Sequence, residues 1–368
     1  MTIRKSSFRT SFFLISLLAL AMLVLTACGD QESQAQPLAN QGANNDNDRA
    51  TENTETPAQN KPIVLYANDF VDVIGDMFKE ATGYEVEVVH GGGGEVLSRV
   101  EAEQGNPQWD VIWLDGHASL YGLAERGFFL KDWEPSNLEN LNEQGKELLH
   151  PNNAYFPTGV HAAATIAYNT NLIDPSDAPQ TWEEFFSLDQ PIAMADPGIA
   201  APAYPVVSWF FYDLGMEPAE EMFDQLFSQK NLHVFPKNGP VGNAVATGEV
   251  AAAALQEHNG YALMQAGEPI EMIWPEEGSP GSVRVAAIGK HTENVEVAKA
   301  FIEFLLDPET QNQLTALDDT EGYFTPFVKD VSPNPAREKD PVLALPDVKW
   351  ASEYESYIKQ WFADRAVQ

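Results

Sequence analysis

The stretch from Glu85 to Gly116 constrains the fold more than any other part of this sequence. A valine-rich run at 86–89 has a strand pattern, and four glycines, Gly91–Gly94, then remove every side chain from the turn. Glu95 opens a segment with apolar residues at helical spacing, and 111–114 is typical of a short buried strand. We therefore expect a βαβ unit whose turn leaves backbone N–H groups bare at a helix N-terminus.

Strand and helix patterns also alternate before this stretch. Residues 63–67 form a predicted strand, followed by a helix pattern for which Asn68 or Asp69 is a plausible N-cap. This alternation predicts a parallel α/β sheet, in which ligands bind beyond the carboxyl ends of the strands. The turns at 67–69, 91–95 and 115–117 should therefore share one rim.

The length and charge of the chain limit its class. The 368 residues suffice for two domains of ordinary size. The formal net charge of −34 argues against a nucleic-acid partner, because the phosphate backbone repels such a surface. A small anionic ligand remains compatible, since salt screens surface charges and local groups decide its affinity.

The N-terminal segment has the features of an export signal. Three basic residues precede an apolar run at 12–25, which is short for a membrane-spanning helix. Leu25-Thr26-Ala27-Cys28 follows and looks like a bacterial lipobox, which implies cleavage before Cys28 and its acylation. The alternative is an ordinary signal peptide or a retained anchor. Residues 29–61 have no aromatic side chain, so 28–61 is predicted to be a lipidated cysteine with a disordered tether.

Several different short motifs follow one another along the predicted globular part of the chain. They are Tyr66-Ala67, Thr82-Gly83-Tyr84-Glu85-Val86, Gly93-Gly94-Glu95-Val96, Asn106-Pro107-Gln108-Trp109-Asp110-Val111, Pro179-Gln180-Thr181-Trp182-Glu183-Glu184, Asp196-Pro197 and Trp274-Pro275-Glu276-Glu277-Gly278. With the segments 159–171 and 298–311, they resemble periplasmic solute-binding proteins of ABC importers. The resemblance covers nearly all of residues 62 to about 315. The specific resemblance is to the branch that contains ferric-iron, 2-aminoethylphosphonate and sugar-phosphate binders.

The resemblance implies an α/β fold of the type 2 periplasmic-binding-protein class, with two lobes that close on a ligand. The implied segments are a signal peptide at 1–27, lobe 1 at 62–161 and 284–327, and lobe 2 at 162–283 and 328–368. A strand over 161–168 should cross between the lobes, a strand over 283–288 should return, and a closing helix over 351–363 should pack on lobe 2. The implied partners are a small polar solute, the ABC permease and ATPase subunits and, through the lipid anchor, a membrane. The protein would be an extracytoplasmic monomer without a cofactor.

Candidate ligand-binding residues combine these turns with motif positions. They are Asn68, Asp69, Gly92, Gly93, Gly94, Glu95, Trp113, Asp115, His161, Asp196, Tyr204, Glu257, His258 and Glu277. The glycine turn either receives an oxyanion or is only a tight turn, and Glu95 either faces the ligand or caps its own helix. The loop at 200–203 lacks the hydroxyl groups that the family often has there. Glu277 either faces the ligand or braces the hinge.

Three functions remain open at this point. The favoured one is a lipid-anchored binder of a small organic phosphate or phosphonate. A ferric-iron binder is the alternative, although the sequence has no adjacent tyrosine pair and only His161, His258 and Asp115 as substitute ligands. Hydrolysis of phosphate esters is a third function. The chain lacks the G-x-S-x-G, P-loop and H-E-x-x-H motifs, and its only cysteine is Cys28.

Overall fold

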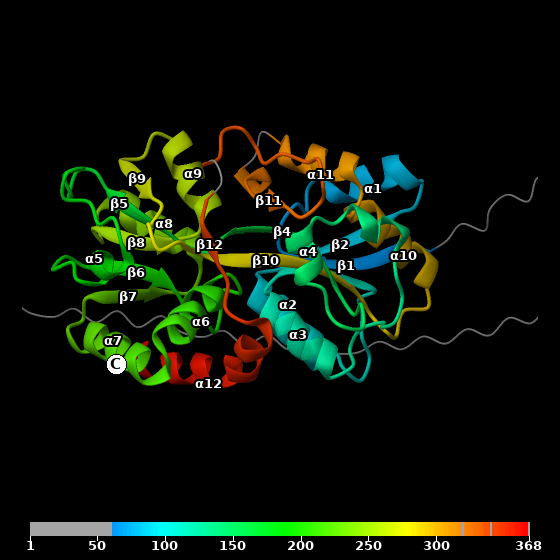
Figure 1. Ribbon diagram of the computed structural model, residues 1–368, viewed down its shortest axis with the longest axis horizontal. Coiled ribbons are helices and arrows are strands. Elements are labelled where there is room, and N and C mark those ends of the chain that lie inside the picture. The colour runs from blue at the N-terminus through cyan, green and yellow to red at the C-terminus, as the bar shows by residue number, and fades with distance from the viewer. Residues whose placement is uncertain (1–60, 318–319, 339–340, 367–368) are drawn as a thin grey trace, which may run out of the picture. The chain divides into compact units, whose positions relative to one another are not determined.

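Two β-sheets, each flanked by helices, form the computed structural model of this protein (Figure 1). The structure describes residues 61–317, 320–338 and 341–366. The predicted signal peptide, Cys28 and nearly all of the tether lie outside the described residues. The predicted α/β class with mixed sheets is confirmed.

The first sheet has the strand order β11-β4-β10-β3-β1-β2, with β12 paired to β10. Its strands are β1 (Ile63–Ala67), β2 (Val86–His90), β3 (Val111–Asp115), β4 (Phe156–Ala162), β10 (Ser279–Ile288), β11 (Thr325–Pro326) and β12 (Leu343–Ala344). The strands β1, β2 and β3 are parallel, as predicted, whereas β10 runs antiparallel to both β3 and β4. The elements that accompany this sheet are α1 (Ile74–Thr82), α2 (Gly93–Ala102), α3 (His117–Glu125), η1 (Ser136–Asn140), α4 (Glu143–Glu147), α10 (Val295–Leu305), α11 (Pro308–Thr315) and η2 (Thr320–Gly322).

The second sheet has the order β7-β6-β8-β5-β9. Its strands are β5 (Thr165–Asn169), β6 (Ile192–Ala195), β7 (Leu232–Phe235), β8 (Ala252–Leu255) and β9 (Ile270–Ile273). Its helices are α5 (Trp182–Phe186), α6 (Ala203–Leu214), α7 (Met216–Ser228), α8 (Asn238–Thr247) and α9 (Glu257–Gln265). We call the part built on the first sheet lobe 1 and the part built on the second sheet lobe 2. The residue boundaries predicted for the lobes stay a prediction.

Separate hydrophobic cores support the two lobes. The first core gathers side chains from both faces of the first sheet, including Phe78 of α1 and Phe301 of α10, whose ring centroids lie 5.1 Å apart. The second contains an aromatic group around Phe210 and Phe223, with centroids 6.2 Å apart. Each sheet therefore has its own buried support, and the polar groups between the sheets are not needed to form either core.

The predicted crossing strand at 161–168 is wrong in detail. The structure divides it into β4, which ends at Ala162 in the first sheet, and β5, which begins at Thr165 in the second. The predicted return strand is β10, which begins four residues earlier, at Ser279. The chain thus passes from the first sheet to the second through a short segment of small residues, which suits a hinge.

The predicted helix caps at Asn68 and Asp69 are also wrong. Helix α1 begins at Ile74, and Val73 stands at its N-cap position without a side-chain cap. Phe70 has a positive φ of 58° and turns the chain before the helix begins. This turn directs the polar groups of Asn68 and Asp69 toward β3 and β10 and away from the helix.

The closing helix α12 (Val348–Ala366) is longer than predicted and contacts both lobes. Its Ile358, Trp361 and Phe362 belong to the lobe 2 core, as expected. Its Glu355 also accepts a hydrogen bond from Ser119 of α3 in lobe 1. The sequence did not reveal this second contact, because Glu355 lies on the polar face of the helix pattern.

Candidate functional site

Polar side chains from β1 and β3 meet at the carboxyl ends of these strands. The amide nitrogen of Asn68 donates to Asp115 Oδ2 over 3.0 Å, and the Asp115 backbone N–H donates to Asn68 Oδ1 over 3.2 Å. Asn68 directly follows β1, and Asp115 is the last residue of β3, so the parallel sheet itself brings them together. This confirms that two of the predicted turns share a rim.

Arg284 joins this pair from the antiparallel strand β10. The sheet register sets Arg284 opposite Asp115, and its Nε lies 3.3 Å from Asp115 Oδ1. Its Nη2 donates to Asp69 Oδ2, and its guanidinium lies 4.7 Å from the centroid of the Phe70 ring. Burial opposes the charge on Arg284, but the carboxylates of Asp115, Asp69 and Glu321 together raise the pKa of its guanidinium.

This group buries more carboxylates than cations. Asp115 is 0% exposed and Asp69 is 8% exposed, and both lie against the single guanidinium of Arg284. Burial raises the pKa of the Asp69 carboxyl, while the charge of Arg284 opposes this shift. Among the described residues, Asp115 Oδ1 has no aligned hydrogen-bond donor, although Arg284 Nε is near. A buried oxygen without a donor is costly and suits a donor from a bound molecule.

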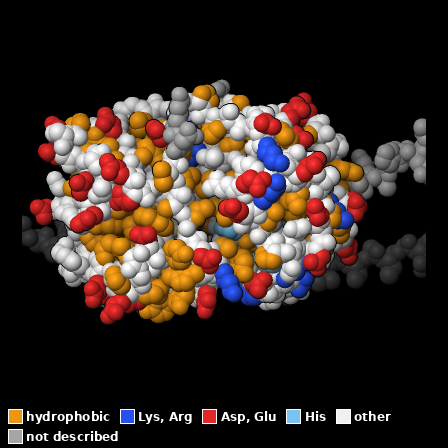
Figure 2. All heavy atoms as spheres, in the orientation of Figure 1, with side chains coloured by type: hydrophobic (Ala, Val, Ile, Leu, Met, Phe, Trp, Pro, Cys, Tyr) orange, Lys and Arg blue, Asp and Glu red, His pale blue; other side chains and the backbone are white. Residues whose placement is uncertain are grey.

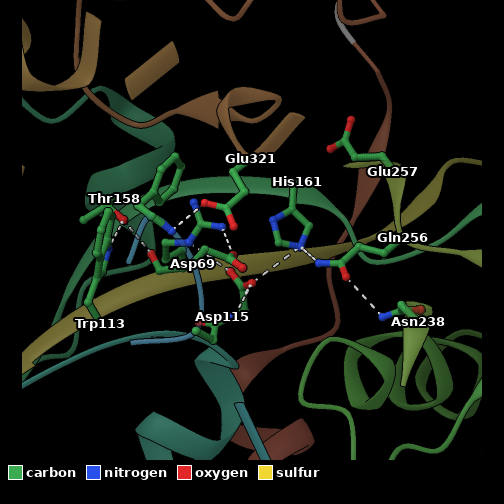
Figure 3. Close-up of polar contacts among 12 residues, drawn as sticks. Asp69, Trp113, Asp115, Thr158, His161, Asn238, Gln256, Glu257 and Glu321 are labelled. Carbon is green, nitrogen blue, oxygen red and sulfur yellow. Dashed lines mark hydrogen bonds and ion pairs between the residues drawn. The ribbon is translucent and has the colours of Figure 1, made fainter. Parts of the chain in front are cut away.

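Lobe 2 reaches the same place through amide side chains (Figure 3). Asn238 Nδ2 donates to Gln256 Oε1 over 3.1 Å, and Gln256 Nε2 lies 2.9 Å from His161 Nε2. Because the amide nitrogen of Gln256 only donates, His161 Nε2 must accept, as it does in the neutral ring. Burial, followed by the charge of Arg284, lowers the pKa of His161 well below its usual value, in agreement with this geometry.

The contacts therefore form one chain of polar groups across both lobes. His161 Nε2 also lies 3.8 Å from Asp115 Oδ2, so the neutral ring places the amide side chains next to the carboxylates without a hydrogen bond between these two acceptors. We call the connected set the interlobe cluster. It consists of Asn68, Asp69, Asp115, His161, Asn238, Gln256 and Arg284.

Glu257 and His258 lie next to the cluster in different settings. Glu257 is 0% exposed, and its carboxylate accepts from Arg337 Nε (2.7 Å) and Nη2 (2.8 Å) and from the Ala162 N–H (2.6 Å). Protein donors therefore reach both of its oxygens, unlike the ligand-facing carboxylate expected from sequence. His258 is half-buried, with its ring centroid 5.9 Å from that of His161.

The glycine turn differs most from its predicted surroundings. The Gly92 N–H already donates to Glu95 Oε2 over 2.9 Å, which is the self-capping alternative. Gly93 and Gly94 face Ile199 and Ala201 of the lobe 2 loop at such short range that a Cβ atom on either glycine would overlap that loop. The structure thus places lobe 2 where the sequence suggested an open oxyanion site.

Four other predicted residues have partners of their own. Trp113 is 2% exposed and lies in the core, where its Nε1 donates to Thr158 Oγ1 over 3.0 Å. The Tyr204 hydroxyl donates to the Ala351 carbonyl, and Asp196 Oδ1 accepts from the Gly198 N–H in its own loop. Glu277 Oε1 accepts from the Trp182 N–H over 2.5 Å, which fits the bracing role.

Sequence reasoning missed Arg284, Gln256, Asn238 and the nearby Lys237. Lys237 Nζ lies 3.3 Å from Glu95 Oε1, so it faces lobe 1 across the interface between the lobes. One signal was available for Arg284, because a charged residue inside the buried run 283–288 requires a partner. The amide side chains gave no comparable signal, since isolated Asn and Gln residues are common in loops and helices.

Metal ligation and membrane crossing are both limited by the arrangement of the described residues. Within residues 61–317, 320–338 and 341–366, no group of three or more His, Cys, Asp or Glu side chains could hold a metal ion. In the same part of the chain, every helix is too short or too polar to cross a membrane.

Comparison with known proteins defines the class. Residues 74–344 match the family model described as bacterial extracellular solute-binding protein, and the chain belongs to this family. Its function class is that of a solute-binding component of an ABC importer, acting outside the cytoplasm.

Individual relatives of known name share only a modest fraction of identical residues with this chain. A putative 2-aminoethylphosphonate-binding periplasmic protein of Salmonella typhi is 24% identical over 306 residues, which cover 81% of this chain and 86% of the relative. A spermidine/putrescine-binding periplasmic protein of Salmonella typhimurium is 27% identical over 239 residues, covering 60% and 65% of the two chains.

Solved structures share the fold. The periplasmic binding protein AfuA from Actinobacillus pleuropneumoniae, with fructose-6-phosphate bound, matches with a TM-score of 0.73 and 21% identity over 83% of this chain and 98% of AfuA. Iron-bound HitA from Pseudomonas aeruginosa matches with a TM-score of 0.70 and 21% identity over 81% and 98%. At these identities the likeness shows the fold alone.

Proposed function

We propose that this protein is a lipid-anchored solute-binding protein whose ligand is a small zwitterion with an ammonium group and a phosphonate or phosphate group. The observation that carries the ligand class is the buried carboxylate of Asp115, whose Oδ1 lacks an aligned donor among the described residues. An ammonium group would supply both a hydrogen bond and the positive charge that Arg284 alone does not provide.

The oxyanion of the solute requires a different surface. Lys237 carries the cation of lobe 2 near the glycine turn, and it precedes the first residue of helix α8. A helix N-terminus together with an ammonium side chain favours an anion. In the proposal, His258 and Asn68, both half-buried, contact the body of the solute.

Relatives of both kinds support this assignment. The ligand in the name of the first relative, 2-aminoethylphosphonate, has an ammonium group and a phosphonate group. The ligands in the name of the second, spermidine and putrescine, have ammonium groups only. The ammonium group is the feature that these ligands share. In our proposal, Cys28 carries the lipid, the permease and ATPase subunits receive the solute, the protein is a monomer, and it binds its ligand without turnover.

Calorimetry with three solutes tests the ligand class. We expect 2-aminoethylphosphonate to bind more tightly than putrescine, which lacks the oxyanion, and than glucose-6-phosphate, which lacks the ammonium. Tighter binding of putrescine or glucose-6-phosphate than of 2-aminoethylphosphonate would contradict the proposal. Binding of ferric citrate alone would favour the iron alternative.

The lipid anchor has a separate test. Cells that express the protein are grown with an alkyne-labelled fatty acid, and the labelled protein is detected after a click reaction. We expect label on the natural sequence and none after Cys28→Ser. Equal labelling of both proteins would show that Cys28 does not carry the lipid.

A further inference from the structure

The glycine turn meets lobe 2 at two positions, Gly93 and Gly94. A Cβ atom built on Gly93 would lie 2.4 Å from the Cβ of Ala201, and one built on Gly94 would lie 2.2 Å from the carbonyl oxygen of Ile199. Real Cβ atoms essentially never approach other heavy atoms within 3.0 Å. Any side chain at either position would therefore force the loop at 199–201 away from α2.

Backbone geometry does not explain these glycines. None of Gly91–Gly94 has a positive φ, so an ordinary residue could adopt the conformation of this turn. Gly91 and Gly92 are approached mainly by ends of side chains, those of Val96 and Glu95. Only Gly93 and Gly94 face atoms of lobe 2 that cannot swing aside, namely an alanine Cβ and a backbone carbonyl.

We propose that Gly93 and Gly94 are closure residues, which position the lobes by allowing α2 to lie directly against the loop at 199–201. Their missing side chains set how closely the two lobes approach. This inference deepens the proposed function, since closure is what holds a solute between the lobes, but it does not depend on which solute is bound.

The neighbouring ion pair supplies a reporter for this contact. Lys237 Nζ of lobe 2 lies 3.3 Å from Glu95 Oε1 of lobe 1, and both side chains are more than half exposed. A water-soluble carbodiimide activates the carboxylate, and attack by the lysine amine forms an amide with release of the corresponding urea. The amide can form only while the lobes are in contact at this point, so its rate of formation measures closure in the full chain without any solute.

Substitution by alanine separates closure from anion binding. Gly93→Ala keeps the backbone N–H and adds one methyl group in the overlap, and alanine is a better helix former than glycine. We expect the 95–237 cross-link, quantified by peptide mass spectrometry, to form at least tenfold more slowly in Gly93→Ala, as overpacking of this size predicts. Gly105→Ala is the matched control, because a Cβ there meets nothing within 4 Å.

A second substitution makes the test reciprocal. Ala201→Gly removes the atom that Gly93→Ala would strike, so the double variant should recover most of the natural cross-linking rate. The same Ala201→Gly change should not rescue Gly94→Ala, whose obstacle is the backbone carbonyl of Ile199. Circular dichroism of each variant verifies that it is folded.

The possible outcomes are distinct. An unchanged rate in Gly93→Ala, or a loss of rate that Ala201→Gly does not restore, would overturn the proposed role of Gly93. Absence of the cross-link in the natural sequence would contradict the contact itself. None of these results depends on 2-aminoethylphosphonate, so failure of the ligand proposal in calorimetry would leave this inference standing.

Discussion

The two walls of the interlobe cluster differ in charge. Lobe 1 contributes two buried carboxylates, Asp69 and Asp115, which share the guanidinium of Arg284 from β10. Lobe 2 contributes the amides of Asn238 and Gln256, which bond to one another and to His161. The first wall thus carries net negative charge in a buried place, whereas the second wall is neutral there and has the exposed cation of Lys237 at its edge.

Because the two walls differ in charge, one molecule can satisfy both only if its own ends differ in charge. An ammonium group fits the first wall and an oxyanion fits the edge of the second. Two like walls would select a symmetrical ion, such as a diamine. In the proposed complex, this asymmetry also orients the solute, with its ammonium toward Asp115 and its oxyanion toward Lys237.

The largest expected effect comes from giving the second wall an unpaired charge. Glu257 lies beside Gln256 of the cluster (Figure 3). Arg337→Met leaves the Glu257 carboxylate buried without its bidentate partner. We expect the free energy of unfolding to fall by about 3–5 kcal/mol in urea titrations. Lys79→Met, which breaks an exposed pair with Glu85, is the control and should leave the midpoint unchanged. Equal midpoints for both variants would refute the buried role of Arg337.

Neutralising the first wall should have the next largest effect. Asp115→Asn keeps the size of the side chain but removes the charge that the ammonium requires. We expect the affinity for 2-aminoethylphosphonate to fall about 100-fold, or about 2.7 kcal/mol, in calorimetry. Asp196→Asn, whose carboxylate caps its own loop, should bind nearly as well as the natural protein. A reversed ranking of these two variants would place the ammonium elsewhere.

Removing the cation of the second wall should have a smaller effect. Lys237 is about half exposed, so its attraction for an oxyanion is weakened by solvent. We expect Lys237→Met to weaken 2-aminoethylphosphonate about fivefold and to leave the affinity for putrescine unchanged or higher. Lys290→Met is the control, because Lys290 lies beyond the end of β10, where its backbone N–H donates to the Phe128 carbonyl. A similar loss for both solutes would contradict contact between Lys237 and the oxyanion.

Mild acidification should have the smallest effect, a modest loss of folding stability as two buried histidines become protonated. Burial lowers the pKa of His117 to about 4, and burial also lowers that of His161. Because the unfolded chain then binds more protons below pH 6.5, the stabilisation is complete above that pH and is lost as the pH falls toward 4. For His117, whose pKa falls to about 4, we expect a loss of about 1 kcal/mol between pH 6.5 and 5.5. Urea titrations of His117→Gln should show a shallower loss, and an identical slope would exclude His117.

Much of the fold could be predicted from local patterns. The strands at 63–67 and 86–89 follow from their local apolar patterns, and both are confirmed. The failure at the N-terminus of α1 has its cause in tertiary packing. Phe70 turns the chain because its ring packs on Trp113, at a centroid distance of 5.3 Å, and such tertiary packing leaves no local signal.

The candidate site was predictable in Asn68, Asp69, Asp115 and His161, but not in Arg284 or in the lobe 2 amides. Asn68, Asp69 and Asp115 follow or end parallel strands, so the topology alone brings them to one rim. Arg284 and Gln256 could not be placed, because the antiparallel register of β10 and the approach of lobe 2 join residues far apart in the chain. The glycine turn was misjudged for the same reason, since Ala201 is more than a hundred residues from Gly93.

We propose that the first wall recognises the ammonium group and that the second wall recognises the oxyanion. Calorimetry with 2-aminoethylphosphonate and ethylphosphonate, which differ only in the amine, measures what the ammonium contributes to affinity. We predict that this contribution is large in the natural protein and in Lys237→Met and that it disappears in Asp115→Asn. An ammonium contribution that survives Asp115→Asn unchanged would contradict the claim.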